Sequence, residues 1–437
     1  MFDGLIAFGH SIWSFCDPLS IGLILLSSLV GVIIGALPGL TATMGVALMT
    51  TLTIKMPSNQ ALLVLICTYV GAIYGGSRSA ILLNIPGTPA SAAACLDGHA
   101  LAKQGHAGRA MGIATSGSVL GTLIGMFFLA LFTPILGNLA LKFGSYEFFW
   151  LALFGVIIAG TLTGNDPLKG WIAGLIGIFS ATIGQEAIYA HDRFTFGSRD
   201  LAGGLQLVPA LVGAFGFAEL LMAVRERPAP VTINPFDSVI PKLKDVTQYW
   251  RTILRSGVIG TFIGILPGVG EDVAAWSSYA AAKRASKEPE KFGKGSIDGL
   301  MAAETGDNAC VPGAVIPVLT LAIPGSAPAA VLMAAMLIHG VRPGPMIMIE
   351  APTFVYDVVA MMMFATIGIL IYGLTLTKLL IKVLMVPKPI ILPIIFVLCV
   401  VGSYAISQRL FDVWVMLSFG VLGYALRRMH FPVAPLV

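Results

Sequence analysis

The stretch GVIIGALPG, residues 31–39, interrupts a long charge-free run and returns as GTFIGILPG, residues 260–268, at an offset of 229 positions. A proline removes a helix hydrogen bond, and the glycine beside it loosens the backbone. Each copy therefore predicts a break in a helix, at Pro38 and at Pro267. The recurrence of the break indicates an internal duplication.

A second motif repeats in the same order and supports the duplication. NIPGTP at residues 84–89 corresponds to AIPGSAP at residues 322–328, at an offset of 238 positions. The second half therefore has about nine extra residues between its two motifs. They fit the loop 283–296, which is longer than its counterpart at 55–59.

Composition places the chain in a lipid bilayer. Of its 437 residues, 57% are hydrophobic and 11% are charged, against roughly 25% charged in a soluble domain. A net charge of +4 is too small for a nucleic-acid binder. The five cysteines occur singly, and the histidines show no ligand spacing, so no cofactor is expected.

Charge-free runs predict the membrane segments, because an ionised side chain is costly at the bilayer centre. A crossing helix needs about 20 residues, so the runs predict about 10–12 segments of an all-α polytopic membrane protein. The runs are 18–54, 56–77, 110–141, 148–165, 170–185, 201–218, 256–270, 308–341, 358–377, 389–408 and 413–426.

Runs 18–54 and 308–341 are too long for one crossing and must fold back or break. Broken backbone at membrane depth is tolerated only where protein or a water-filled cavity satisfies its polar groups. The breaks at Pro38, Pro86, Pro267 and Pro324 therefore predict a cavity.

Basic residues predict opposite orientations for the two copies. Loop 283–294 carries five basic residues and should be cytoplasmic, whereas loop 55–59 carries only Lys55 and should lie outside. After the second motif the bias reverses: Lys103 and Arg109 mark a cytoplasmic turn, and the matching turn at 340–352 has only Arg342. This pattern predicts inverted-topology repeats with broken or re-entrant helices, an architecture of secondary transporters.

We divide the chain accordingly into residues 1–224 (first repeat), 225–252 (cytoplasmic linker) and 253–437 (second repeat). A weaker match sets Phe154-Gly155 against Phe419-Gly420 and places Val437 opposite Ile172, where a segment of the first half begins. We therefore expect that the second repeat lacks its last one or two C-terminal helices here.

Several motifs resemble those of the large membrane subunit of the tripartite tricarboxylate transporters, the TctA family, along essentially the whole chain. They are GAIYGGS (71–77), ILLNIPG (81–87), Glu304 with Asn308-Ala309, IPGS (323–326) and FDVW (411–414).

The resemblance implies a secondary active carrier, a symporter of carboxylates in the bacterial inner membrane, driven by a sodium or proton gradient. It implies as partners a small membrane subunit (TctB-like) and a periplasmic solute-binding protein (TctC-like). It also implies an elevator-type movement, and a homo-oligomer of the membrane heterodimer stays open.

The sequence departs from the family pattern in three places. Where the family tends to show Glu-x-x-Asn-Asn-Ala, the chain has Asp307 in place of the first asparagine. Arg78 is an added base, and Glu271-Asp272 lie beside a break. For these two acids we favour the water interface, with pairing to Lys283, over a cation or proton site.

Residues at the second pair of breaks are the candidate substrate ligands. A half-helix that begins after Pro-Gly offers free N–H groups and a positive dipole end to a carboxylate. The predicted set is Asn84, Gly87, Thr88, Gly325, Ser326, Ser77 and Arg78. Asn84 and the hydroxyls could instead cap helices. For Arg78, a substrate clamp and a structural pair with Glu304 or Asp307 stay open.

Oxygen-bearing groups near the breaks are the candidate ligands of a coupling cation, with sodium the only metal considered. The predicted set is Gly39, Thr41, Thr43, Gly268, Thr305 and Asn308. For the two threonines near the first break, hydrogen bonding back along a helix is an equal alternative. For Glu219, in an apolar helix, we expect a packing or helix-pairing role. For Gly117, Gly121 and Gly125, at four-residue spacing, we expect close helix packing.

The sequence therefore predicts cation-coupled uptake of a di- or tricarboxylate or related organic anion, and no enzyme activity. An uncoupled anion channel would use the same broken helices and is the main alternative. An intramembrane aspartyl protease, raised by Tyr356-Asp357 and by GVGED at 268–272, fits poorly, because the two motifs stand in the reverse order.

Overall fold

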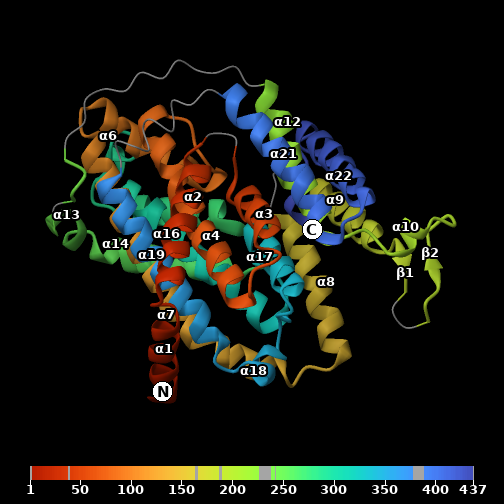
Figure 1. Cartoon of the computed structure of the whole chain (residues 1–437). Helices are drawn as coiled ribbons and strands as arrows, with labels where there is room; N and C mark the ends of the chain where they lie inside the picture. The colour runs from red at the N-terminus through yellow and green to blue at the C-terminus, as the bar shows by residue number, and fades with distance from the viewer. Residues whose placement is uncertain are drawn as a thin grey trace.

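A computed structural model describes residues 2–37, 40–162, 166–186, 189–225, 238–241, 243–376 and 388–436. The described chain is almost entirely helical, as the sequence predicts, with one two-stranded sheet of antiparallel strands (Figure 1).

The elements divide between the two halves. The first half contains α1 (Phe2–Ser14), α2 (Pro18–Ala36), α3 (Ala42–Thr53), α4 (Ser58–Leu83), η1 (Pro89–Ser91), α5 (Ala92–Ala94), η2 (Cys95–His99), α6 (Ala100–Lys103), α7 (Ala107–Ala140), α8 (Ser145–Leu162), α9 (Pro167–Ala181), β1 (Gly184–Gln185), β2 (Asp192–Arg193), α10 (Arg199–Ala202), α11 (Leu207–Leu211), η3 (Val212–Phe217) and α12 (Ala218–Arg225). The remainder contains α13 (Leu243–Thr247), α14 (Trp250–Ile265), α15 (Gly270–Ala285), η4 (Pro289–Lys291), α16 (Ile297–Leu321), α17 (Ala327–Ile338), α18 (Ile347–Glu350), α19 (Phe354–Thr375), α21 (Lys388–Ser407), α22 (Leu410–Arg428) and η5 (Ala434–Leu436).

The long apolar runs are divided into helices at the repeated motifs. Run 18–54 forms α2 and α3, and Pro38 and Gly39 between them lie outside the described residues. Helices α4 and α16 both end in a residue with left-handed backbone, Asn84 (φ 57°) and Ala322 (φ 55°). The two copies of the second motif thus terminate their helices in the same way.

The hairpins α2–α4 and α14–α16 have the same internal packing. A Cβ added at Gly35 would strike the carbonyl oxygen of Ala72, and one at Gly264 would strike that of Cys310. Gly264 follows Gly35 by 229 positions and Cys310 follows Ala72 by 238, which are the offsets of the two repeated motifs. Only glycine permits so close an approach of two backbones. The duplicated glycines therefore build duplicated helix crossings.

The long helix α7 packs against α16 through small residues. Added Cβ atoms at Gly121 and Gly125 would meet the carbonyl oxygens of Thr305 and Ala309 on α16. The predicted packing role of the glycines at four-residue spacing on α7 is confirmed. This crossing is extensive and places the polar residues of α16 in the middle of the helix bundle.

The helices form two groups that meet along one boundary (Figure 1). One group, the central bundle, contains α2, α4, α7, α14, α16 and α19, which pack closely on one another. The other, the lateral group, contains α8, α9, α12, α21 and α22 and carries the β-strands at its edge. Helix α3 and the segment η3 contact each other across the boundary.

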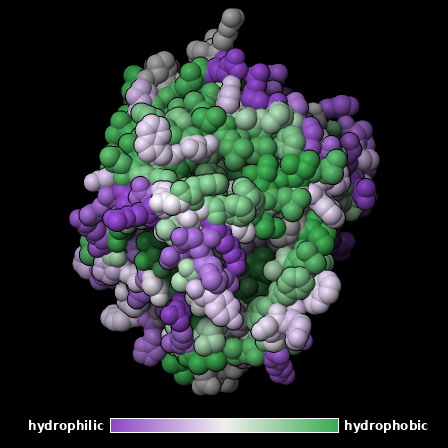
Figure 2. All heavy atoms as spheres, turned by 90° about the vertical axis from the view of Figure 1, so that its right-hand side faces the viewer, coloured by the Kyte–Doolittle hydropathy of each residue, from purple (hydrophilic) through white to green (hydrophobic). Residues whose placement is uncertain are grey.

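Six of the helices within the described residues are long and apolar enough to cross a membrane, and four shorter apolar helices accompany them. Large apolar side chains stay exposed on the lateral group, among them Trp171, Leu175 and Trp414. On the face in Figure 2, apolar side chains form broad continuous areas. A soluble protein rarely exposes such areas, so this surface suits contact with lipid.

The loops gather at two edges of the molecule. The loop before α16 donates backbone N–H groups of Gly293 (2.8 Å) and Ser296 (2.8 Å) to Asp97 in η2. Arg109 pairs with Asp245 of α13 (2.6 Å), close to the same edge. At another place Ser58 donates to the carbonyl of His339 (2.7 Å).

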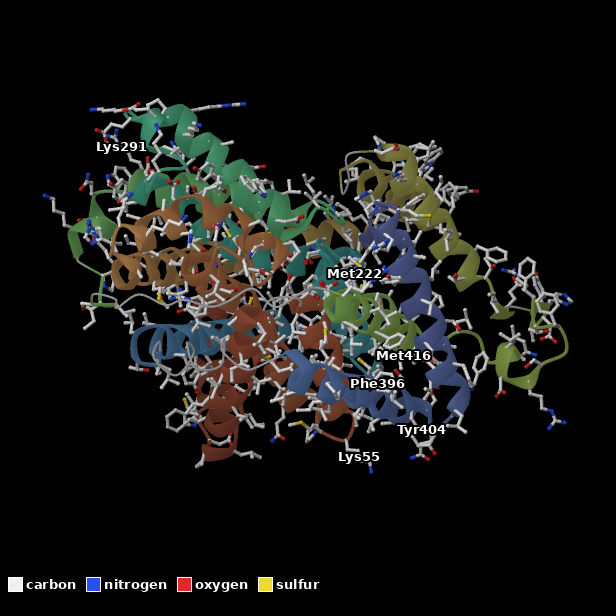
Figure 3. All side chains as sticks on the ribbon, turned by 90° about the horizontal axis from the view of Figure 1, so that it is seen from above. Lys55, Met222, Lys291, Phe396, Tyr404 and Met416 are labelled. Atoms are coloured by element: carbon white, nitrogen blue, oxygen red, sulfur yellow. The ribbon has the colours of Figure 1, made fainter. Side chains whose placement is uncertain are left out.

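These contacts match the grouping expected from charge. Among the described parts of the segments predicted to be cytoplasmic, Gln104 donates to the carbonyl of Lys294 (2.9 Å) and Arg109 pairs with Asp245. Among the segments predicted to be external, Ser58 in 55–59 bonds to His339, the residue before 340–352. Figure 3 shows Lys55 and Lys291 at opposite edges. Residues 226–237 and 242 of the linker lie outside the described residues.

Candidate functional site

A cavity of about 330 Å³ lies where the broken segments of both halves meet. It lies between the central bundle and the lateral group. Its lining comes from Thr41–Thr43 and Thr88–Ala90 in the first half, Gly268–Val273 and Ala327–Pro328 in the second, and Phe215, Glu219, Arg427 and Phe431–Val433 on the lateral side. The cavity predicted from the helix breaks is therefore present in the described structure.

Backbone hydrogen bonds hold the breaks of the second half together. The N–H groups of Gly268 and Gly270 donate to the carbonyls of Pro324 and Gly325, both at 3.2 Å. In the first half the N–H of Gly87 donates to the carbonyl of Gly76 (3.4 Å). These bonds satisfy groups that the breaks release from helices, which lets irregular backbone persist at membrane depth.

Two of the predicted hydroxyls cap helices. Thr41 Oγ1 accepts from the N–H of Met44 (3.2 Å) and begins α3. Ser326 Oγ accepts from the N–H of Ala329 (3.4 Å) and begins α17. Both hydroxyls therefore cap helices in this structure. Capping was the alternative named for Ser326, whereas for Thr41 it was hydrogen bonding back along a helix. Thr88 begins η1 in a capping box with Ser91, whose hydroxyl accepts from the Thr88 N–H (3.3 Å) and donates to the Thr88 carbonyl (2.8 Å). Thr88 Oγ1 makes no hydrogen bond of normal geometry within the described part of the chain.

The structure divides the predicted ligand residues. Thr41, Thr43, Thr88 and Gly268 line the cavity. Asn84 is exposed in its left-handed cap, and Gly87 and Gly325 lie against the backbone carbonyls of Gly35 and Gly264. Pro86, Pro267 and Pro324 lie at the breaks, and Pro38 and Gly39 fall outside the described residues. Ser77, Arg78, Thr305 and Asn308 are buried behind the cavity.

Arg78 is not among the residues that line the cavity. Its Nη1 donates to the carbonyl of Met111 (3.2 Å) and its Nη2 to Thr115 Oγ1 (3.3 Å). The guanidinium carbon lies 4.5 Å from the ring centroid of Tyr74, a cation–π geometry. These contacts fix the side chain at full burial.

Acidic side chains line the cavity more densely than the sequence predicts. Glu271 was expected at the water interface, paired to Lys283, and this was wrong. Glu271 is buried, lines the cavity and accepts a hydrogen bond from the hydroxyl of Tyr69. The hydroxyl also lies 2.8 Å from Ser326 Oγ. Asp272 is exposed and also lines the cavity.

The lateral wall carries one ion pair. Glu219 of α12 pairs with Arg427 of α22, so the helix-pairing role expected for Glu219 is confirmed. Both residues also line the cavity, and Arg427 is the single basic side chain in its described lining. Three carboxylates and one guanidinium therefore face this space, which gives it a net negative charge.

A buried polar cluster lies behind the cavity, between α4, α7 and α16. Glu304 Oε2 accepts from the hydroxyls of Ser77 (2.6 Å) and Ser118 (3.0 Å). Asn308 Nδ2 donates to Ser118 Oγ (3.0 Å). Asp307, 1% exposed, has no hydrogen-bond partner for either carboxylate oxygen among the described residues. An ionised carboxylate buried in this way costs several kcal/mol unless a cation or proton compensates it.

At the edge with the basic loop, charge is preserved by a local contact. Glu288 accepts a hydrogen bond from Lys291 Nζ (2.7 Å), and this bond raises the pKa of Lys291 above its usual value. Lys291 therefore stays positively charged near neutral pH.

Tyr69 and Arg427 were missed by the sequence reasoning. Tyr69 occupies the position that matches Asp307 at the offset of 238, so aligning the two motifs outward would have drawn attention to it. Arg427 lies in the last turn of α22, where a basic residue is common, and no motif surrounds it. Only the fold brings it to the cavity.

The helix breaks of both halves and the cavity between them define a transporter architecture. The sequence profile of the Tripartite tricarboxylate transporter TctA family matches residues 21–437. The chain belongs to this family. It is therefore a multi-pass membrane protein of a tripartite transport system and not an enzyme.

Two relatives come from Agrobacterium vitis. The uncharacterized 52.8 kDa protein in TAR-I ttuC' 3'region is 34% identical over 410 residues, which cover 94% of this chain and 82% of that protein. The uncharacterized protein in TAR-II ttuC' 3'region is 34% identical over 178 residues, 41% of this chain and 74% of that protein. No solved structure matches the chain.

Proposed function

We propose that the chain takes up a di- or tricarboxylate, or a related organic anion, by cation-coupled secondary transport across the bacterial inner membrane. A sodium or proton gradient drives the uptake. A periplasmic solute-binding protein delivers the anion, and a small membrane subunit completes the carrier. The observation that carries the proposal is the cavity built from the helix breaks of both halves.

The cavity has groups that can hold an organic anion. Arg427 offers a guanidinium whose Nη1 already pairs with Glu219 and whose remaining N–H groups can donate to a carboxylate. Thr88 presents a hydroxyl without a partner within the described chain, beside the start of a helical turn. Glu271 and Asp272, which also line the cavity, would repel the anion. Bound cations would favour its entry because they would reduce this repulsion. Coupling to a cation follows naturally from such a lining.

The position of the cavity supports an elevator-type movement. Broken helices of the central bundle form one side of it, and α12, α22 and the chain after α22 form the other. A displacement of the bundle along this boundary would carry the cavity from one side of the membrane to the other. The separation of the loops into two edges supports the inverted repeat that such a mechanism uses.

Uptake in proteoliposomes tests the proposal. The chain is reconstituted with its small subunit, the binding protein is added, and labelled carboxylate uptake is measured under sodium and proton gradients. Uptake that collapses when both gradients are dissipated supports the carrier. A carboxylate current that persists without coupling would support the channel instead.

Single substitutions test the predicted ligands in the same assay. Asn84→Ala and Ser326→Ala should each abolish uptake while membrane insertion stays intact. Asn138→Ala, which removes an exposed amide on α7, is the control and should transport normally. Unchanged uptake in both test variants would assign Asn84 and Ser326 to helix capping alone.

A further inference from the structure

Acceptor oxygens without donors lie along one face of α16. Glu304, Asp307 and Asn308 are spaced by three and four residues, so their side chains share a face of the helix. All three are at most 1% exposed. Within the described structure, Glu304 Oε1, Asn308 Oδ1 and both oxygens of Asp307 have no hydrogen-bond partner.

Several donors around this face are already engaged, whereas Arg78 Nε and the hydroxyl of Thr305 have no partner within the described residues. The hydroxyls of Ser77 and Ser118 reach the other oxygen of Glu304. The amide nitrogen of Asn308 donates to the carbonyl oxygen of Glu304 (3.0 Å), which can only accept, and this contact fixes the amide with Oδ1 as an acceptor. A proton would satisfy only part of such a set. A small cation, which prefers several hard oxygen ligands, would satisfy more of it.

Charge leads to the same conclusion. Arg78 is the basic group that faces this cluster, next to Ser77, which binds Glu304. Its positive charge acts on Glu304 and is not among the charges that act on Asp307. Glu271 and Asp272 of α15 approach Asp307 from the other side and repel it. The charged neighbours of Asp307 among the described residues are therefore acids, and a monovalent cation would offset part of this negative charge.

The duplication shows what is missing at Asp307. Its counterpart is Tyr69, whose hydroxyl joins Glu271 and Ser326. The counterpart of Ser326 is Thr88, which directly precedes η1, a segment that packs on α16. Asp307 is much shorter than tyrosine, and neither it nor Thr88 Oγ1 makes the equivalent bond within the described residues. The first half closes this contact with a phenol, whereas the second half leaves its oxygens open.

We propose that Asp307 anchors a sodium ion, with Glu304 Oε1 and Asn308 Oδ1 on the same helix face and Thr88 Oγ1 opposite as further ligands. The assignment of this ion as the coupling ion rests on the proposed function. The site itself does not, because it follows from the charge and the unpaired oxygens of α16.

Sodium-dependent stability tests the site without transport. The purified chain in detergent, with its small subunit, is heated in increasing sodium chloride, with choline chloride holding the ionic strength constant. We expect sodium to raise Tm in the wild type. Asp307→Asn should abolish the rise or raise the half-maximal sodium concentration by about tenfold or more. Asp357→Asn, an equal charge change at a residue bound to Ser11 outside the cavity lining, should match the wild type.

Thr88→Val keeps the size of the side chain and removes the hydroxyl, and it should weaken the sodium response several-fold. It carries the test if Asp307→Asn does not fold. A wild type without any sodium response, or an unchanged sodium titration in Asp307→Asn or in a folded Thr88→Val, would overturn the site. A normal sodium response in a complex that transports no carboxylate would leave the site standing and remove the proposed function.

Discussion

The two broken-helix hairpins share a backbone and differ in what they place on it. In both, glycines on the first helix (α2 or α14) contact the backbone of the third (α4 or α16). Each third helix ends in a left-handed residue before Ile-Pro-Gly. After the break they diverge. The second half continues as one regular helix, α17, whereas the first half continues as the short segments η1, α5, η2 and α6.

The side chains diverge at the contact between the halves. Tyr69 of the first hairpin closes a hydrogen-bonded contact with Glu271 and Ser326, whereas Asp307 of the second leaves its oxygens unpaired within the described chain. The duplicated pattern is therefore retained where the helices pack closely, because glycines at these contacts cannot be replaced without a clash. The positions where side chains meet across the halves are free to acquire different chemistry.

The largest expected effect tests whether the equivalent loops face opposite sides. Single cysteines at positions 57 and 290, in a chain with its five native cysteines replaced, are exposed to a membrane-impermeant thiol reagent in intact and opened vesicles. We expect one position to react only from outside and the other only from the cytoplasmic side. Labelling of both from the same side would contradict the inverted repeat.

The next effect sharpens the shared part of the comparison. Gly87→Val and Gly325→Val would each drive a side chain into a backbone carbonyl, that of Gly35 or of Gly264. Each should cost about 3 kcal/mol or more, because backbone atoms cannot yield to relieve the overlap. Thermal unfolding of the detergent-purified variants measures it. Gly105→Val, at an open turn, tests for general disruption and should show only the cost of its positive φ.

Similar losses in the two variants would support equivalent packing. Tolerance of one substitution and collapse on the other would show that the two hairpins are not equivalent, whatever their sequences share.

A smaller effect concerns the side chains that differ. Tyr69→Phe removes the hydroxyl that donates to Glu271 and should destabilise the chain by about 2 kcal/mol, the value of a hydrogen bond to a charged group. Tyr74→Phe, on the same helix, loses a bond to the neutral hydroxyl of Thr115 and should cost about 1 kcal/mol. Thermal unfolding compares the two, and an equal or smaller loss at Tyr69 would argue against a charged Glu271.

The sequence predicted the repeated framework because the framework rests on local signals. Pro-Gly pairs and charge-free runs located the α16–α17 break and the separation of α2 from α3, and glycine spacing predicted the packing of α7. Each of these signals acts through the backbone near its own position, so it can be recognised without tertiary contacts.

The chemistry of the site was less predictable because distant segments build it. Charge counting placed Glu271 at the water interface, since it cannot distinguish an interface from a polar cavity inside the protein. Counting charge also placed the start of the membrane run at residue 308, after the last acidic side chain of α16. Helix α16 in fact begins at Ile297 and buries Glu304 and Asp307. Arg427 reaches the cavity only through the packing of α22 on α12.

The smallest effect tests the two helix ends. Ala322 adopts left-handed backbone without glycine's freedom or asparagine's tolerance of this region, so Ala322→Gly should stabilise the chain by about 1 kcal/mol. Asn84→Gly should change stability by only a few tenths of a kcal/mol, because asparagine already tolerates this conformation. Thermal unfolding measures both. If the two substitutions changed stability equally, the asparagine side chain at position 84 would stabilise the left-handed turn no more than alanine does at position 322. A capping role alone would then not account for an asparagine there.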